Sequence, residues 1–137
     1  MAVSDWTDHV SGAADLVQLF YGAPPLAELE FMGVLIDERV DCGLTLGFDT
    51  SDIPGADASS LFVGGQNALE FFVVFSGVSK LTVSGWDHTG LQDYGIRTVE
   101  SGSIQVSLAG ETWHITFLAD SCRIEGIRAY RAAIESR

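Results

Sequence analysis

The chain starts with a helical pattern and then changes to a pattern typical of strands. Between His9 and Tyr21, apolar side chains recur every three or four residues beside a polar stripe, which predicts an amphipathic helix. Gly22 and two prolines follow and would end this helix. From Leu29 onward, apolar and polar residues alternate, which is the period of strands with one face against a core.

Short alternating patterns typical of strands occur along the rest of the chain. In the first one, alternation places Phe31 and Leu35 on one face and Met32 and Val34 on the other. The last one fits either a strand or a short helix. The expected strands are 29–36, 44–48, 69–75, 78–86, 96–99, 104–108, 113–117 and 122–130.

The run from Phe71 to Phe75 is apolar at every position. It is too short to cross a membrane and too continuous for a strand with one wet face, so we expect a central strand covered on both faces. The expected fold class is therefore α+β: an antiparallel, meander-rich curved sheet or two-layer sandwich of about seven or eight strands, with one N-terminal amphipathic helix. The length favours a single domain over residues 1–137.

The net charge of −12 narrows the class of partner. Residues 1–79 contain twelve Asp and Glu against one base, Arg39, whereas residues 80–137 contain seven acids and six bases. Such a chain has no sequence-independent affinity for nucleic acid or for an anionic membrane. The excess charge serves solubility alone, or it attracts a cationic partner.

Location and redox state follow from simple patterns. No apolar run approaches the length of a membrane span, and the N-terminus lacks a basic stretch followed by an apolar one, so we expect a soluble cytoplasmic protein. Cys42 and Cys122 lie far apart and form no metal-binding spacing, which favours two reduced, partly buried thiols.

Catalytic motifs are absent from the sequence. It contains neither a GxSxG nucleophile motif nor a glycine-rich phosphate loop, and nineteen acids make any single pair of carboxylates uninformative. Asp87 and His88 would join His114 and Asp120 in a metal site only if the fold brought them together. We therefore expect no enzyme, no cofactor and no metal.

Two groups of acids stand out, because loops on a rigid scaffold commonly present binding residues. They flank the expected strand 44–48, so a hairpin would place them at its opposite ends and a partner would use one group. The tryptophans add less: Trp113 alternates with core positions, whereas Trp86 suits either a core or a contact role. The candidate binding residues are Asp37, Glu38 and Asp41 in the first group and Asp49, Asp52 and Asp57 in the second.

Four segments carry a resemblance to a known family: LFYGAPPL (19–26), LTLGFDT (44–50), GGQNALEFFVVFSGVSKLTVSGW (64–86) and IRAY (127–130). Together they resemble the bacterial immunity-50 family, whose members are small proteins associated with polymorphic toxin systems. The similarity covers most of the chain, and its most specific piece is the strand that contains Asn67, followed by Leu81 and the Gly85-Trp86 end. The resemblance implies a cytoplasmic protein that neutralises a cognate toxin by binding it.

The leading hypothesis is therefore a non-catalytic immunity protein that meets a basic toxin domain through an acidic surface, and a basic nuclease is the toxin class that this charge favours. Three alternatives remain. One is a sheet-rich ligand- or protein-binding module without a toxin partner, recognisable by an apolar cavity. The others are a hydrolase that uses Asp87, His88 or His114, and a structural subunit that forms a symmetric homo-oligomer.

Overall fold

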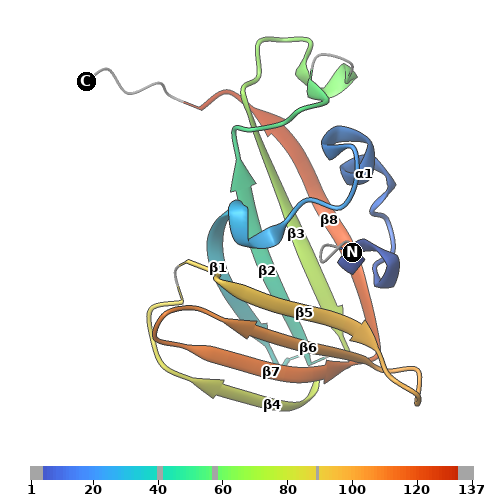
Figure 1. Cartoon of the computed structure of the whole chain (residues 1–137), viewed down its shortest axis with the longest axis vertical. Helices are drawn as coiled ribbons and strands as arrows, with labels where there is room; N and C mark the ends of the chain where they lie inside the picture. Colours follow the sequence, from blue (N-terminus) through green and yellow to red (C-terminus); the bar gives the residue numbers. More distant parts are fainter. Residues whose placement is uncertain (1–4, 40–41, 57–58, 89, 133–137) are drawn as a thin grey trace.

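The structure, a computed structural model, describes residues 5–39, 42–56, 59–88 and 90–132. Within them, eight strands form two antiparallel four-stranded sheets (Figure 1). This confirms the expected fold class. Sheet A has the strand order β1-β2-β3-β8, and sheet B has the order β4-β7-β6-β5. The bounds are β1 (Glu30–Asp37), β2 (Gly43–Thr50), β3 (Ala68–Ser76), β4 (Ser79–Ser84), β5 (Asp93–Thr98), β6 (Ile104–Ala109), β7 (His114–Ala119) and β8 (Ser121–Tyr130).

The two sheets form layers that cross. Sheet B lies over one face of sheet A, here called the inner face, and its strands run steeply across those of sheet A (Figure 1). The helix α1 (Ala14–Phe20) and short 3₁₀ turns cover the inner-face side chains of sheet A that sheet B does not reach (Figure 1). Sheet A therefore has a covered inner face and an outer face on the other side.

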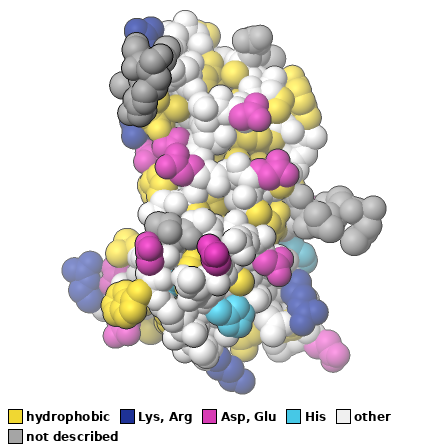
Figure 2. All heavy atoms as spheres, turned by 60° about the vertical axis from the view of Figure 1, so that its left-hand side comes forward, with side chains coloured by type: hydrophobic (Ala, Val, Ile, Leu, Met, Phe, Trp, Pro, Cys, Tyr) yellow, Lys and Arg dark blue, Asp and Glu magenta, His cyan; other side chains and the backbone are white. Residues whose placement is uncertain are grey.

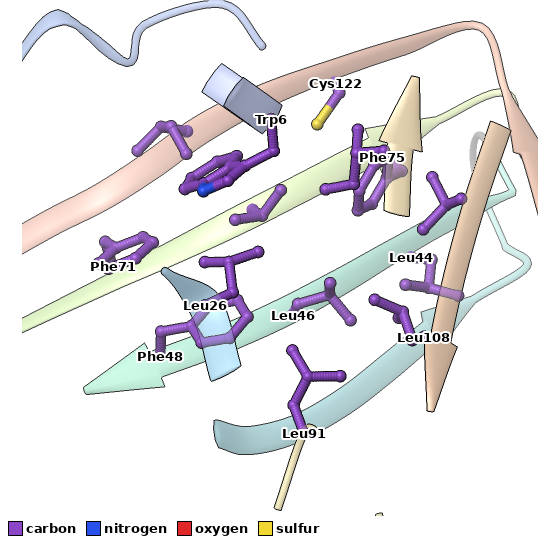
Figure 3. Close-up of a cluster of buried hydrophobic side chains, with 14 of the residues drawn as sticks. Trp6, Leu26, Leu44, Leu46, Phe48, Phe71, Phe75, Leu91, Leu108 and Cys122 are labelled. Carbon is purple, nitrogen blue, oxygen red and sulfur yellow. The ribbon is translucent and has the colours of Figure 1, made fainter. Parts of the chain in front are cut away.

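The core is one continuous cluster between these layers. Trp6 and Leu26 from the helical segments point toward the same interior as Phe75 of β3 and Leu108 of β6 (Figure 3). The rings of Phe75 and Phe117 meet edge to face across the two sheets, with centroids 5.0 Å apart. Apolar side chains from every layer thus share one water-free volume.

The N-terminal helix is shorter than its pattern predicts. Instead of one helix over 9–21, the chain forms a 3₁₀ turn, η1 (Asp5–His9), and only later α1. Gly12 lies between them with a φ of 77°, a left-handed conformation that interrupts a helix. Ser11 makes two backbone hydrogen bonds of 2.9 Å to β8, so pairing with a strand replaces the first helical turn.

A β-bulge in β1 makes the predicted alternation wrong. The pairing of β1 with β2 shifts between Phe31 and Gly33, which leaves Met32 as an extra residue. Phe31 and Val34 consequently both face the core, while Met32 and Leu35 face outward. Sequence periodicity cannot register an inserted residue of this kind, since both sides of the bulge keep a period of two.

The prediction that both faces of β3 are covered is also wrong. Phe71, Val73 and Phe75 are fully buried on the inner face, but Phe72 and Val74 lie on the outer face and are only half-buried. The Phe72 ring lies over two glycines of the neighbouring strands: a Cβ on Gly47 would come within 3.2 Å of it. Apolar side chains on the outer face are therefore partly buried because they pack on one another and on the backbone of glycines. No further layer of the described residues covers them.

The two thiols differ in their surroundings. Both cysteines are free, but Cys42 is exposed, so the prediction that both thiols are partly buried is wrong. Cys122 lies in the core, and its burial raises the pKa of the thiol to about 12. Cys122 is thus an uncharged core side chain at neutral pH.

Replacing Phe71 tests the inner-face packing of β3. Phe71→Ala removes a fully buried ring that stacks on Phe48 at 5.5 Å, so the free energy of unfolding should fall by about 3–5 kcal/mol. Urea denaturation followed by circular dichroism measures this change. Val63→Ala, at a side chain that is 83% exposed, is the control and should change the free energy of unfolding by less than about 0.5 kcal/mol. Equal midpoints for the two variants would contradict the assignment of Phe71 to the core.

Candidate binding surface

The first predicted acidic group lies at the turn between β1 and β2. Asp37 is the last residue of β1, Glu38 follows it and is exposed, and Asp41 lies outside the described residues. The Asp37 carboxylate accepts hydrogen bonds from the backbone and guanidinium of Arg39, at 2.9 to 3.2 Å. These bonds lower the pKa of Asp37 and raise the pKa of Arg39. The charge of Asp37 is therefore balanced within the turn by Arg39.

The second predicted group begins on β2. Asp49 projects from the outer face of sheet A, Asp52 follows the end of β2 and is exposed, and Asp57 lies outside the described residues. Because β1 pairs antiparallel with β2, Asp49 stands opposite Glu30 while Asp37 stands opposite Gly43. The two groups thus lie at opposite ends of the hairpin, as the sequence predicts.

Asp49 belongs to an acidic row that sequence reasoning missed. Glu30 on β1, Asp49 on β2 and Glu70 on β3 are direct cross-strand partners on the outer face, and the next position, on β8, is Arg128. Arg128 forms an ion pair of 2.8 Å with Glu70. Glu30, Asp49 and Glu70 are here called the acidic row. Directly opposed like charges repel one another across a sheet, and the ion pair of Glu70 with Arg128 offsets part of this repulsion.

Only strand register reveals the row. Glu30 and Glu70 are forty residues apart in the sequence, each at an ordinary outward position of its strand. A weak signal was available, because an acid occurs at an outward position in three expected strands. The sequence does not say which strands are neighbours, and β3 pairs with both β2 and β8.

An apolar strip lies next to the acidic row on the same face. Met32 and Leu35 from β1 are exposed, and Phe72 and Val74 from β3 lie half-buried beside them. β2 lies between these two strands, and its Gly47 has no side chain on this face: a Cβ there would come within 3.2 Å of Met32 and Phe72. We call Met32, Leu35, Phe72 and Val74 the outer apolar strip. Acidic and apolar side chains therefore share one sheet face.

Tyr130 fixes the central carboxylate of the row. Its hydroxyl donates a hydrogen bond to Asp49, and this bond, with a smaller effect of burial and of the neighbouring acids, raises the pKa of Tyr130 to about 12. The Arg128 guanidinium lies over the Tyr130 ring, 5.0 Å from its centroid. The end of β8 thus orients the acidic row from one side.

The view in Figure 2 gives the charge distribution from the side of the molecule that is on the left in Figure 1. Acidic side chains and exposed apolar side chains intermingle across the middle of this view, and basic side chains lie toward its periphery. A partner that approaches this side would meet mainly negative charge around apolar contact points.

The metal site weighed above does not form among the described residues. Among the residues that the structure describes, no three His, Cys, Asp or Glu side chains lie close enough to hold a metal ion. His114 begins β7 and Asp120 follows its end, which separates them by about 20 Å at the rise of a strand. His88 instead contacts the ring of Trp113, with centroids 5.1 Å apart.

Two surface hollows have walls that mix polar and apolar side chains. One, of about 580 Å³, lies on the outer face of sheet B and has Arg97, Gln105 and His114 in its wall. Another, of about 610 Å³, lies beside α1 and includes Asp15 and Gln18. Polar and charged side chains thus contribute to both walls.

None of the helices among the described residues is long and apolar enough to cross a membrane.

Titration of Tyr130 tests the geometry of the acidic row. Since the pKa of Tyr130 is raised from about 10 to about 12, its hydroxyl stays protonated up to a pH where ordinary tyrosines are ionised. Its bond to Asp49 therefore contributes stability below pH about 10 and loses it as the pH rises through about 12. Absorbance titration near 295 nm should show a late tyrosine step that Tyr130→Phe removes. A wild-type curve without that step would contradict the bond to Asp49.

One of the comparisons with known proteins identifies a family. The family model described as Immunity protein 50 matches residues 12–130, which is most of the chain and includes both sheets. The comparisons with curated proteins and with solved structures give no match. The chain belongs to the Immunity protein 50 family, and this membership implies a protein that protects against a toxin.

Proposed function

We propose that this protein neutralises a cognate protein toxin by binding it, without catalysis, through the acidic row and the outer apolar strip. The toxin partner follows from the family, and the surface is our inference from the arrangement of the residues. The partner would be a basic domain, and a basic nuclease is the toxin class that this charge favours. Binding would take place in the cytoplasm of the cell that makes the toxin.

The observation that carries this proposal is the acidic row itself. Glu30, Asp49 and Glu70 stand side by side on an outer sheet face, and Arg128 on β8 is the basic residue that continues the row beyond Glu70. Their mutual repulsion lowers the stability of the free protein. Lysine or arginine side chains of a partner would remove the repulsion and form charge-assisted hydrogen bonds, which are the stronger class.

Net charge supports the same role over longer distances. A protein with a charge of −12 attracts a basic domain before contact, and such steering raises association rates about 10- to 1,000-fold. Fast association is useful to an inhibitor, because even a small amount of free toxin is harmful. The same charge repels nucleic acid and anionic membranes, so we do not expect these as partners.

The outer apolar strip would supply the short-range part of the affinity. Opposite charges set the rate and orientation of encounter, whereas buried apolar contacts at the centre of an interface contribute most of the binding free energy. Met32 and Leu35 are exposed next to the acidic row, so a partner covering the row would also cover them. Steric blockage of the toxin would then be sufficient for inhibition.

Growth rescue tests the function. The toxin domain encoded next to this gene is expressed in a bacterial host with and without this protein. We expect rescue, together with co-purification of the two chains. Absence of rescue, with an active toxin and a folded inhibitor, would remove that neighbour as the partner and favour a binding module without a toxin.

Paired charge variants test the surface. Glu30→Gln with Asp49→Asn changes the net charge by the same amount as Asp37→Asn with Glu38→Gln at the hairpin turn. If the acidic row meets the toxin, the first pair should lower the association rate at low salt by about tenfold and the second much less. Stopped-flow measurements at 20 mM and 500 mM salt provide the comparison, since screening should reduce both rates and remove most of the difference. Equal effects of the two pairs would show that only net charge matters, and a wild-type rate independent of salt would contradict the electrostatic part of the proposal.

A further inference from the structure

Trp86 is the most exposed large apolar side chain of the described residues, with 88% of its surface accessible. The other two tryptophans, Trp6 and Trp113, are in the core, with 2% and 4% accessible. A tryptophan offers about 150–250 Å² of surface for burial, so solvent exposure forgoes a large stabilising contribution. Its orientation into solvent therefore calls for an explanation other than folding.

The backbone that presents Trp86 is held in place on both sides. Gly85 has a φ of 90°, and a Cβ on it would lie 2.2 Å from the carbonyl oxygen of Thr112. Asp87 also has a positive φ, of 63°, which is uncommon for a residue with a side chain. We call Gly85 to His88 the Trp86 turn. Its conformation is determined by contact with the β6–β7 connection rather than by Trp86.

His88, at the other end of the turn, contacts both the turn backbone and a core aromatic ring. Its Nε2 donates a hydrogen bond of 3.0 Å to the Gly85 carbonyl oxygen, and its ring meets Trp113 edge to face with centroids 5.1 Å apart. Trp113 in turn stacks on Phe31 at 5.8 Å. Because the turn is already ordered, binding through Trp86 loses little conformational entropy.

These ring contacts also place the turn near the proposed binding surface. Phe31 lies next to Glu30 on β1, so two successive ring contacts connect the start of β1 with the Trp86 turn. β1 is one of the two edge strands of sheet A. The connection between β4 and β5, which contains the turn, runs along the left side of the molecule in Figure 1, and Figure 2 brings this side forward.

Charges around the turn match those of the acidic row. Strand pairing places Asp93 of β5 at the same end of sheet B as Trp86, and Glu111 lies in the adjacent β6–β7 connection. The cations Lys80 and Arg97 lie toward the opposite ends of their strands. β4 and β5 are the two edges of sheet B, so a partner that covers this end of the sheet would meet the Trp86 ring and, across β7 and β6, the carboxylate of Asp93.

From these observations we propose that Trp86 is the apolar anchor of the toxin interface, which extends around the β1 edge from the acidic row to the Trp86 turn. The occupant is the basic toxin domain, with an apolar pocket for the indole and lysine or arginine side chains at the pocket rim. This inference rests on the proposed function. Binding hot spots are enriched in tryptophan, and a ring on a preformed turn bordered by charge has the features of such a residue.

Affinity measurement tests the anchor directly. Trp86→Ala should weaken binding of the toxin domain by about 30-fold or more, whereas Trp86→Phe should retain part of the affinity. Val63→Ala, which also truncates an exposed apolar side chain, should bind like the wild type. The urea midpoint of Trp86→Ala should be unchanged, because the side chain makes little contact with the fold. Binding of Trp86→Ala within about threefold of wild type would overturn the proposal.

A spectroscopic measurement locates the contact independently. Labelling this protein with 5-fluorotryptophan gives one fluorine resonance for each of its three tryptophans, and Trp86→Phe assigns the exposed one. The chemical shift of the Trp86 resonance differs between H₂O and D₂O when the ring is exposed. This solvent isotope shift should disappear when unlabelled toxin domain is added, while the two core resonances change little. A Trp86 resonance that stays solvent-sensitive in the complex would overturn the proposal, as would one that loses this sensitivity on concentration of the protein alone.

The role of Trp86 and the proposed function can be contradicted separately. If the wild-type protein protects cells but Trp86 stays exposed in the complex, Trp86 is not the anchor and the proposed function still holds. If the wild-type protein neither protects cells nor binds the toxin, both the proposed function and the role of Trp86 are wrong.

Discussion

The whole structure depends on keeping the inner face of sheet A away from water. β2 and β3 present fully buried leucine, valine and phenylalanine side chains at alternate positions, and no single element of this chain is large enough to cover them. Sheet B covers part of this face and the N-terminal helical segments cover the rest. Burial of apolar surface is the dominant favourable term in folding, so this constraint explains why a seven-residue helix and several 3₁₀ turns are ordered at all.

Covering one face of sheet A with every available layer leaves the other face to the solvent. The outer face accordingly carries features that folding does not need. These are a row of three opposed carboxylates and an apolar strip that packs over glycine backbone. Features that reduce stability and yet occur together on one surface are those expected of a binding surface. Because the chain belongs to the Immunity protein 50 family, a toxin is the partner that we propose for this surface.

The Trp86 turn shows the same division of roles on a smaller scale. Core aromatic residues hold its backbone, and the tryptophan it presents contributes little to that core. The ordered backbone and the exposed tryptophan thus come from adjacent positions of the chain. In the interface that we propose, this arrangement would require little rearrangement on binding, which would favour rapid and tight inhibition.

The sequence by itself determined the approximate positions of the strands, the fold class, the family resemblance and the excess of negative charge, but it predicted one helix over 9–21 where the structure has η1 and α1. These follow from local periodicity, turn residues and composition, which do not depend on contacts between distant segments. It also placed the two predicted acidic groups at opposite ends of the β1–β2 hairpin, because hairpin geometry is local.

Only the tertiary structure decided which strands are neighbours, and this choice created the acidic row from Glu30, Asp49 and Glu70. It also decided that Phe72 and Val74 lack a covering layer, that a bulge at Met32 turns Leu35 outward, and that Trp86 meets the solvent. Apart from the bulge, which lies within the β1–β2 hairpin, the deciding contacts join segments far apart in the chain. Such contacts are selected by the total apolar area buried in the folded state, which no local pattern encodes.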